Sequence, residues 1–174
     1  ALAKVWKIDE TEADPRLREC HFRVACDVNN PLCGTNGATY IYGPQKGVTE
    51  NQKKQLDEDM AHFAQITSQA LGTDYCNTPG AGAAGGLGFA FLSYLGAALT
   101  PGIELILNAV GLEQELSDAD VVVTGEGRLD FQTAMGKAPV GIAKMAKKHG
   151  AKVIALAGAV IEGAQECNEQ GIDA

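Results

Sequence analysis

The fold of this chain is decided by residues 119–157, ADVVVTGEGRLDFQTAMGKAPVGIAKMAKKHGAKVIALA. The apolar run 121–124 has the composition of a buried strand. A helix is expected over 139–149, because its last turn carries the positive charges that a helix C-terminus favours and Gly150 follows as a stop. The apolar run 152–157 predicts a second strand. A strand, a helix and a strand at this spacing predict a parallel crossover, and therefore an α/β fold.

The connection between the first strand and the helix, TGEGRLDFQTAMGK at 124–137, is unusually polar. It follows the C-terminal end of an expected parallel strand, which is where open α/β sheets bind ligands. Arg128 offers a planar fork for phosphate or carboxylate oxygens, and Lys137 precedes the helix N-terminus, where a phosphate is favoured. Three glycines permit positive φ and a close backbone approach to an anion. They are Gly125, Gly127 and Gly136.

Two carboxylates of the same loop, Glu126 and Asp130, suit Mg²⁺, which proteins bind through one or two carboxylates together with phosphate oxygens and water. Either carboxylate could instead orient a substrate or take a proton from its hydroxyl group. A solvated loop in which Arg128 pairs with an acidic neighbour explains the same residues without a ligand. The position at a parallel strand end favours the functional interpretation.

A second glycine-rich segment, 80–88, contains the spacing G-x-G-x-x-G. A dinucleotide-binding fingerprint needs a strand directly before it, but 72–78 is polar and turn-like. The acidic residue expected about twenty positions later is also lacking, since Glu104 falls in an expected helix. The segment fits a glycine-rich helix entrance that a ligand or another stretch of backbone can approach. Tight helix packing through Gly and Ala explains it equally well.

A third polar cluster, Asp27, Asn29 and Asn30, follows an expected strand over 22–28. Its side chains could bind a metal or substrate hydroxyl groups, or could make an Asx turn before the proline that follows. The remaining expected elements are a strand over 38–42, a helix over 49–71 that Thr49 and Gln52 begin with a capping box, and a helix that starts at Thr100 and ends before Gly111. We expect two parts, 1–78 and 79–174, or one continuous domain.

The composition excludes several classes of protein. The net charge of −8 argues against nucleic acid and anionic membranes as partners. Five cysteines without a C-x-x-C pair favour reduced thiols in a cytoplasmic protein. Residues 80–99 are uncharged and long enough to span a bilayer, but their glycines and the lack of flanking basic residues favour a buried helix.

Three stretches resemble, in order, the bacterial glycerate kinase family of the glycerate 2-kinase type. They are VACDVNNPLCGTNGATYIYGPQKGVT, PGAGAAGGLGFAFL and TGEGRLDFQTAMGKAPVGIAK. The resemblance implies ATP-dependent phosphorylation of D-glycerate to a phosphoglycerate with Mg²⁺. It also implies a three-layer α/β fold with a parallel or mixed sheet, helices on both faces and an active site in a cleft. Family members are longer, so we expect the chain to match their central portion and to be incomplete at both ends.

The matched motif positions and the chemistry of the side chains and glycines in these stretches suggest three groups of site residues. The expected catalytic residues are Asp27, Arg128, Asp130 and Lys137. The expected substrate- or phosphate-binding residues are Asn29, Asn30, Gly80, Gly82, Gly85, Gly86, Gly125, Glu126 and Gly127. Asp130 and Glu126 are the expected Mg²⁺ ligands. The alternative function is a non-catalytic nucleotide- or acid-binding module, and an NAD-dependent oxidoreductase ranks last.

Overall fold

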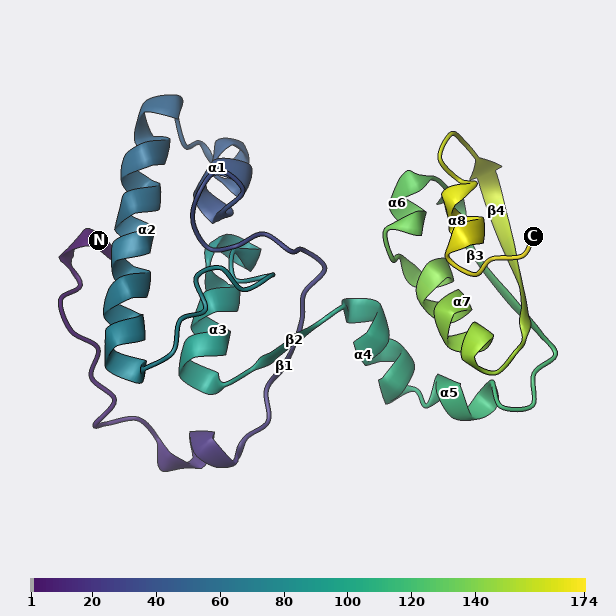
Figure 1. Cartoon of the computed structure of the whole chain (residues 1–174), viewed down its shortest axis with the longest axis horizontal. Coiled ribbons are helices and arrows are strands. Elements are labelled where there is room, and N and C mark those ends of the chain that lie inside the picture. Colours follow the sequence, from purple (N-terminus) through teal and green to yellow (C-terminus); the bar gives the residue numbers. More distant parts are fainter. Residues whose placement is uncertain (1) are drawn as a thin grey trace. The chain divides into compact units, whose positions relative to one another are not determined.

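The computed structural model describes residues 2–174, which form two compact units divided between Pro101 and Gly102 (Figure 1). The boundary expected at 78/79 falls inside the first unit. Each unit contains one pair of parallel strands accompanied by helices, so the α/β class is confirmed. Within the described residues, none of the helices combines the length and the apolar character that a membrane span requires.

The first unit contains short 3-10 helices, three α-helices and one strand pair. Its elements are η1 (Leu2–Lys4), η2 (Pro15–Glu19), β1 (Arg23–Ala25), α1 (Ala38–Tyr42), η3 (Pro44–Lys46), α2 (Glu50–Leu71), η4 (Ala83–Gly85), α3 (Leu87–Leu95) and β2 (Ala98–Thr100). The long helix α2 begins and ends as expected. Gln52 accepts a hydrogen bond from the Thr49 N–H at its start (3.0 Å), and Gly72 ends it with φ 74°. The expected buried helix after the glycine-rich segment is α3.

The core of the first unit joins α2, α3, the loop before α1 and the glycine-rich segment before α3. Its buried members are Leu32, Ala64, Ala81, Phe89 and Leu92. Phe63 of α2 meets Phe89 of α3 edge to face, with ring centroids 6.1 Å apart. This contact holds the glycine-rich segment, which leads directly into α3, against the long helix.

The prediction of a strand over 38–42 is wrong, because these residues form helix α1. Their β-rich composition is overridden by local hydrogen bonds. The Gly43 N–H donates to the Thr39 carbonyl (3.1 Å), and the Tyr42 hydroxyl donates to Asn30 Oδ1 (2.6 Å). β-Propensity is a weak guide where contacts of this kind determine the secondary structure. The strand expected over 22–28 is present but shorter, as β1, and it pairs with β2 from Arg23↔Ala98 to Ala25↔Thr100.

The second unit is the strand–helix–strand crossover that the opening stretch predicts, preceded by two helices. Its elements are α4 (Gly102–Ala109), α5 (Leu112–Glu115), β3 (Val121–Leu129), α6 (Phe131–Ala134), α7 (Ala138–Lys148), β4 (Lys152–Val160) and α8 (Glu166–Glu169). Strands β3 and β4 are parallel, from Val121↔Lys152 to Leu129↔Val160. Val140 and Ala143 of α7 and Val153 of β4 are fully buried in the core of the unit.

Strand β3 is longer than the sequence predicts, and this corrects the placement of two glycines. Gly125 and Gly127 lie inside the strand, because the pairing with β4 continues past them to Leu129. Neither has positive φ, whereas Gly136, beyond the strand, has φ 113°. The polar connection is therefore shorter than expected, and Glu126 and Arg128 project from a strand rather than from a loop.

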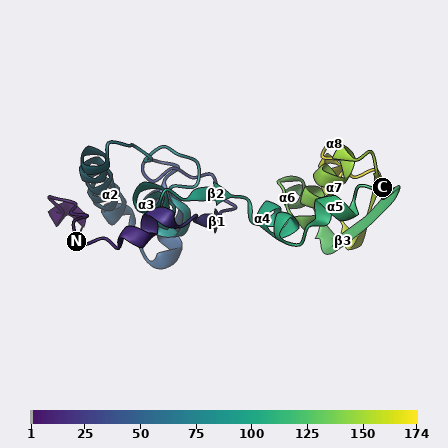
Figure 2. The same ribbon diagram turned by 90° about the horizontal axis from the view of Figure 1, so that it is seen from below.

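The two faces of the β3–β4 pair differ. Val122, Val153 and Ala155 point toward α7 and pack into the core. In Figure 2, α7 and α8 lie above β3. The opposite face, which we call the open face, includes Val121, Val123, Gly125, Gly127, Lys152, Ile154, Leu156 and Gly158. Its four large apolar side chains are exposed. Apolar residues on both faces are typical of a parallel sheet.

Candidate functional site

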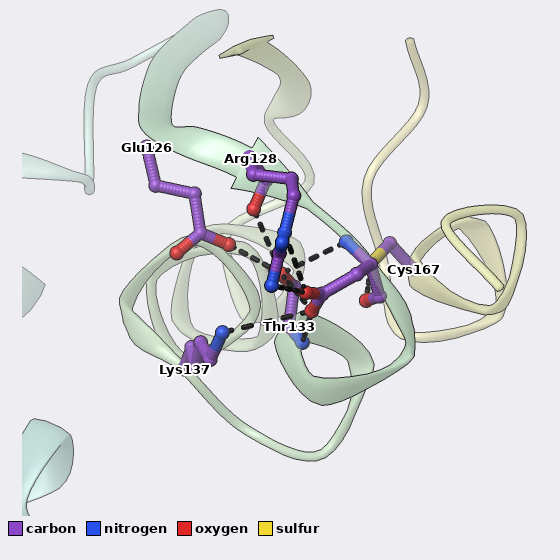
Figure 3. Close-up of polar contacts among 6 residues, drawn as sticks. Glu126, Arg128, Thr133, Lys137 and Cys167 are labelled. Atoms are coloured by element: carbon purple, nitrogen blue, oxygen red, sulfur yellow. Dashed lines mark hydrogen bonds and ion pairs between the residues drawn. The ribbon is translucent and has the colours of Figure 1, made fainter. Parts of the chain in front are cut away.

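The candidate site is built around Asp130, which directly follows β3 and caps α6. Figure 3 shows the side chains that gather there. Its side chain is almost fully buried, with the residue 1% exposed. Oδ1 accepts a hydrogen bond from the Thr133 N–H (3.1 Å), and Oδ2 accepts from Arg128 Nε (3.0 Å). Arg128 Nη2 lies 2.9 Å from Oδ2, and Lys137 Nζ lies 3.6 Å from Oδ1. A buried carboxylate thus holds two cations.

The surroundings of Asp130 keep its carboxylate charged. Burial raises the pKa of Asp130, but the Thr133 N–H, the Arg128 guanidinium and the Lys137 ammonium together outweigh it, and the pKa lies below its ordinary value. Asp130 is therefore an anchor for positive charge at neutral pH.

Arg128 and Lys137 combine a fixed position with exposure. Their side chains are 58% and 41% exposed, although each contacts a carboxylate that is buried. Arg128 projects from β3 toward the helix side of the sheet, and Lys137 is the N-cap of α7. The N-terminus of an eleven-residue helix therefore begins at a lysine that Asp130 holds together with an arginine. This arrangement can bind an anion through a guanidinium and an ammonium group.

Glu126 lies two residues before Arg128 on the same face of β3. One of its oxygens, Oε1, accepts a hydrogen bond from the Thr133 hydroxyl. Among the hydrogen bonds of residues 2–174, none occupies the second oxygen, Oε2. Asp130 differs, because both of its oxygens are already engaged by protein donors.

These donor sets decide how Mg²⁺ fits the site. A single carboxylate with phosphate oxygens and water is an ordinary Mg²⁺ environment, and the free oxygen of Glu126 meets that requirement. The oxygens of Asp130 would first have to give up Arg128 or Thr133. The described part of the chain contains no group of three or more His, Cys, Asp or Glu side chains that could hold a metal on its own. Glu126 is therefore the better of the two expected ligands.

Two residues of the cluster were not expected from the sequence. Thr133 is fully buried and bonds both Asp130 and Glu126. The signal for it was a capping box, Asp130-Phe131-Gln132-Thr133, at the start of α6. Cys167 of α8 places its Sγ 3.9 Å from the Asp130 carbonyl. Burial, Glu126 and Asp130 raise the pKa of its thiol, so the thiol stays protonated and can donate.

The other expected residues lie in the first unit, where two predicted clusters come together. A Cβ on Gly82 would lie 2.3 Å from the Pro31 carbonyl, and one on Gly80 would lie 2.8 Å from Cys26 Sγ. The glycines therefore allow the segment to pack against the stretch that contains Asp27 and Asn29. Asn30 is engaged on both amide atoms, since it donates to the Asn36 carbonyl (2.8 Å) and accepts from Tyr42.

The glycine-rich segment also borders a cavity of about 670 Å³ within the first unit. Ala84 and Gly85, both with positive φ, form one wall, and a Cβ on Gly85 would meet no other atom. Helices α1 and α2 supply apolar walls, and Lys46 and Asp59 supply charges. Gly80 and Gly82 thus serve close packing, whereas Gly85 faces open space.

Comparison with known proteins points to one family. The model of the glycerate kinase family matches residues 1–174. The glycerate kinase of Halalkalibacterium halodurans is 49% identical over 173 residues, which are 99% of this chain and 46% of that protein. The glycerate 2-kinase of Escherichia coli K12 is 47% identical over 167 residues, which are 96% of this chain and 44% of that protein.

A solved structure agrees with the sequence relatives. The crystal structure of a protein described as glycerate kinase 2 from Salmonella typhimurium LT2 superposes with a TM-score of 0.81 at 39% identity. The match covers 98% of this chain and 50% of that one. This chain therefore spans about half the length of the relatives that it matches.

Proposed function

Because this chain belongs to the glycerate kinase family, we propose that it functions in the ATP-dependent phosphorylation of D-glycerate to a phosphoglycerate. The observation that supports this most directly is the pair of cations, Arg128 and Lys137, held by the buried carboxylate of Asp130 at the end of a parallel strand. Both reactants are anions, and the ends of parallel strands are where α/β proteins bind them.

Phosphoryl transfer needs positioning and charge neutralisation more than covalent chemistry by the protein. Arg128 would bind a phosphate or the glycerate carboxylate with the guanidinium nitrogen that Asp130 does not use. Lys137 would add a point charge beside the first turn of α7. Asp130 would hold both cations in place, because it stays ionised at neutral pH.

Glu126 would hold Mg²⁺ through its free oxygen. When bound, Mg²⁺ would neutralise phosphate charge. In the first unit, Asp27 is the proposed acceptor of the substrate hydroxyl proton, and Asn29 and Gly85 are proposed substrate contacts. We also propose a cytoplasmic location, where the free cysteines would stay reduced.

The test is ADP release from Mg-ATP over a panel of hydroxy acids that includes D-glycerate, with this chain and with the complete gene product. We expect turnover with D-glycerate in the complete product. Lys137→Ala should lower kcat/KM at least tenfold, and Lys144→Ala, an exposed lysine on the same helix, should leave it within about twofold. ADP release in neither protein would refute the proposal, as would equal activity of the two variants.

A further inference from the structure

Thr133 connects the two carboxylates of the site. It is fully buried at the third position of α6. Its N–H donates to Asp130 Oδ1 (3.1 Å), and its Oγ1 accepts from the Asp130 N–H (3.3 Å). Its hydroxyl proton is donated to Glu126 Oε1, across from the helix to the strand. Figure 3 shows the hydrogen bond that joins Thr133 to Glu126 as a dashed line.

The hydroxyl group has one proton, and its direction is determined by these contacts. The other acceptors near it are farther away, with the Arg128 carbonyl at 3.5 Å and Asp130 Oδ1 at 3.4 Å. A hydrogen bond to a charged acceptor is stronger than one between neutral groups. The proton therefore goes to Glu126, which occupies Oε1 and leaves Oε2 as the oxygen available to a ligand.

The helix cap does not need this proton. The cap of α6 consists of the Thr133 N–H on the Asp130 carboxylate and the Asp130 N–H on the Thr133 oxygen. Neither bond uses the hydroxyl hydrogen. The bond to Glu126 is thus additional to the capping role, and it orients a side chain that the cap does not contain.

We propose that Thr133 is a positioning residue, which fixes the Glu126 carboxylate through Oε1 and so leaves Oε2 as the oxygen that would hold Mg²⁺, while Asp130 holds the cations. This inference rests on the proposed function. The orientation of the metal-binding oxygen is thereby assigned to a threonine that is itself fully buried.

The experiment measures binding of Mn²⁺ together with a non-hydrolysable ATP analogue to the complete gene product, by the enhanced relaxation of water protons. Thr133→Val keeps the shape and removes the hydroxyl, and we expect it to weaken Mn²⁺ binding at least tenfold. Thr133→Ser keeps the hydroxyl and should bind within about threefold of wild type. Thr133→Ala serves in place of the valine variant if that variant does not fold.

Two controls separate positioning from general destabilisation. Thr67→Val removes another fully buried threonine hydroxyl, one that pairs with the Tyr94 hydroxyl at 2.7 Å in the first unit. It should lower the melting temperature and leave Mn²⁺ affinity unchanged. In a background of Glu126→Gln, Thr133→Val should add less than twofold to the loss, because the two residues act together. Additive losses in this cycle would overturn the inference.

The same measurements distinguish the inference from the proposed function. Turnover of D-glycerate by wild type with Mn²⁺ affinity that is insensitive to Thr133→Val overturns the positioning role alone. Hydroxyl-dependent Mn²⁺ binding without any ADP release overturns the function alone. Failure of the serine variant to restore binding also overturns the positioning role.

Discussion

Asp130 organises the site through the side chains that it holds. Its two oxygens are engaged by Arg128, Thr133 and Lys137, and its burial makes the loss of any of these partners costly. Removing the carboxylate would release two cations and an N-cap in one step. The effects of substitutions in this cluster should therefore be far from additive.

The charge of Asp130 makes stability depend on pH. The pKa of Asp130 in the folded protein lies below the ordinary value of about 3.9, so the unfolded chain takes up the proton first as pH falls. Its contribution is complete above pH about 5 and is lost as pH falls through the folded pKa. We expect the free energy of unfolding in urea to fall less between pH 5 and 2.5 in Asp130→Asn than in wild type.

The asparagine variant is suitable because Asn is as good an N-cap as Asp. The exposed Asp118→Asn provides the control, and its curve should run parallel to that of wild type. Parallel curves for Asp130→Asn and wild type would contradict the anchor role of this carboxylate.

Arg128 should not tolerate replacement by lysine. The guanidinium uses Nε and Nη2 on one Asp130 oxygen and retains a third nitrogen for a ligand, which an ammonium group on a flexible stem cannot reproduce. We expect Arg128→Lys to lower kcat/KM for D-glycerate at least tenfold, an effect of about 1.4 kcal/mol. Arg18→Lys, at an exposed position of η2, should leave kcat/KM unchanged in the same ADP-release assay.

At this scale the sequence identified the charged residues of the cluster but not all of the contacts among its side chains. Arg128, Asp130 and Lys137 stood out by charge, and the structure brings them together. The pairing of Arg128 with Asp130, considered as an alternative to ligand binding, is present as well, and it leaves both cations accessible. Thr133 was missed because its only local signal was a cap, and its bond to Glu126 depends on how a strand faces a helix.

At the scale of elements, strand β3 continues five residues past its expected end. Gly125 and Gly127 suggested a loop, since glycine weakens strands, but the register with β4 continues past both. The two helices with explicit caps, α2 and α7, were predicted closely. Residues 38–42 were not, because their helix is determined by bonds to Asn30 and Thr39 rather than by propensity.

The two glycines of β3 should respond differently to substitution. A Cβ on Gly125 would lie 2.3 Å from the backbone carbonyl of its partner Leu156, which cannot move without disturbing the ladder. Gly125→Ala should therefore destabilise the protein by about 2 kcal/mol, within the range for overpacking. Gly127→Ala meets no atom within 4 Å and should change the free energy of unfolding by less than about 0.5 kcal/mol. Equal effects in urea denaturation would contradict this register.

The whole molecule divides later than its sequence suggests. The boundary at 101/102 lies between β2 and α4, with no linker of unusual composition. Strand β2 was not expected, because 98–100 continues an apolar stretch, and its pairing with β1 joins segments far apart in the chain. The pairing of β2 with β1 places α3, which directly precedes β2, in the first unit. Sequence patterns do not reveal a pairing between segments so far apart.

Because each unit has its own hydrophobic core, a substitution in one unit should change the stability of that unit alone. Gly125→Ala should speed amide hydrogen exchange in α7 and β4 and leave the amides of α2 unchanged, because contacts cluster within each unit. Hydrogen exchange followed by mass spectrometry gives this comparison directly. Equal loss of protection in α2 would show that the two units open together.

The open face of the β3–β4 pair has a consequence for how the chain behaves at high concentration. Val121, Val123, Ile154 and Leu156 form an exposed apolar row, and Lys152, opposite Val121, places a charge of the gatekeeper kind only at one end of it. The isolated 174-residue chain should therefore self-associate in a concentration-dependent way despite its net charge of −8. Light scattering should show weaker association for Val123→Lys than for Val110→Lys, at an exposed position just after α4. Any covering layer has to bring a flat apolar surface to match the middle of this row.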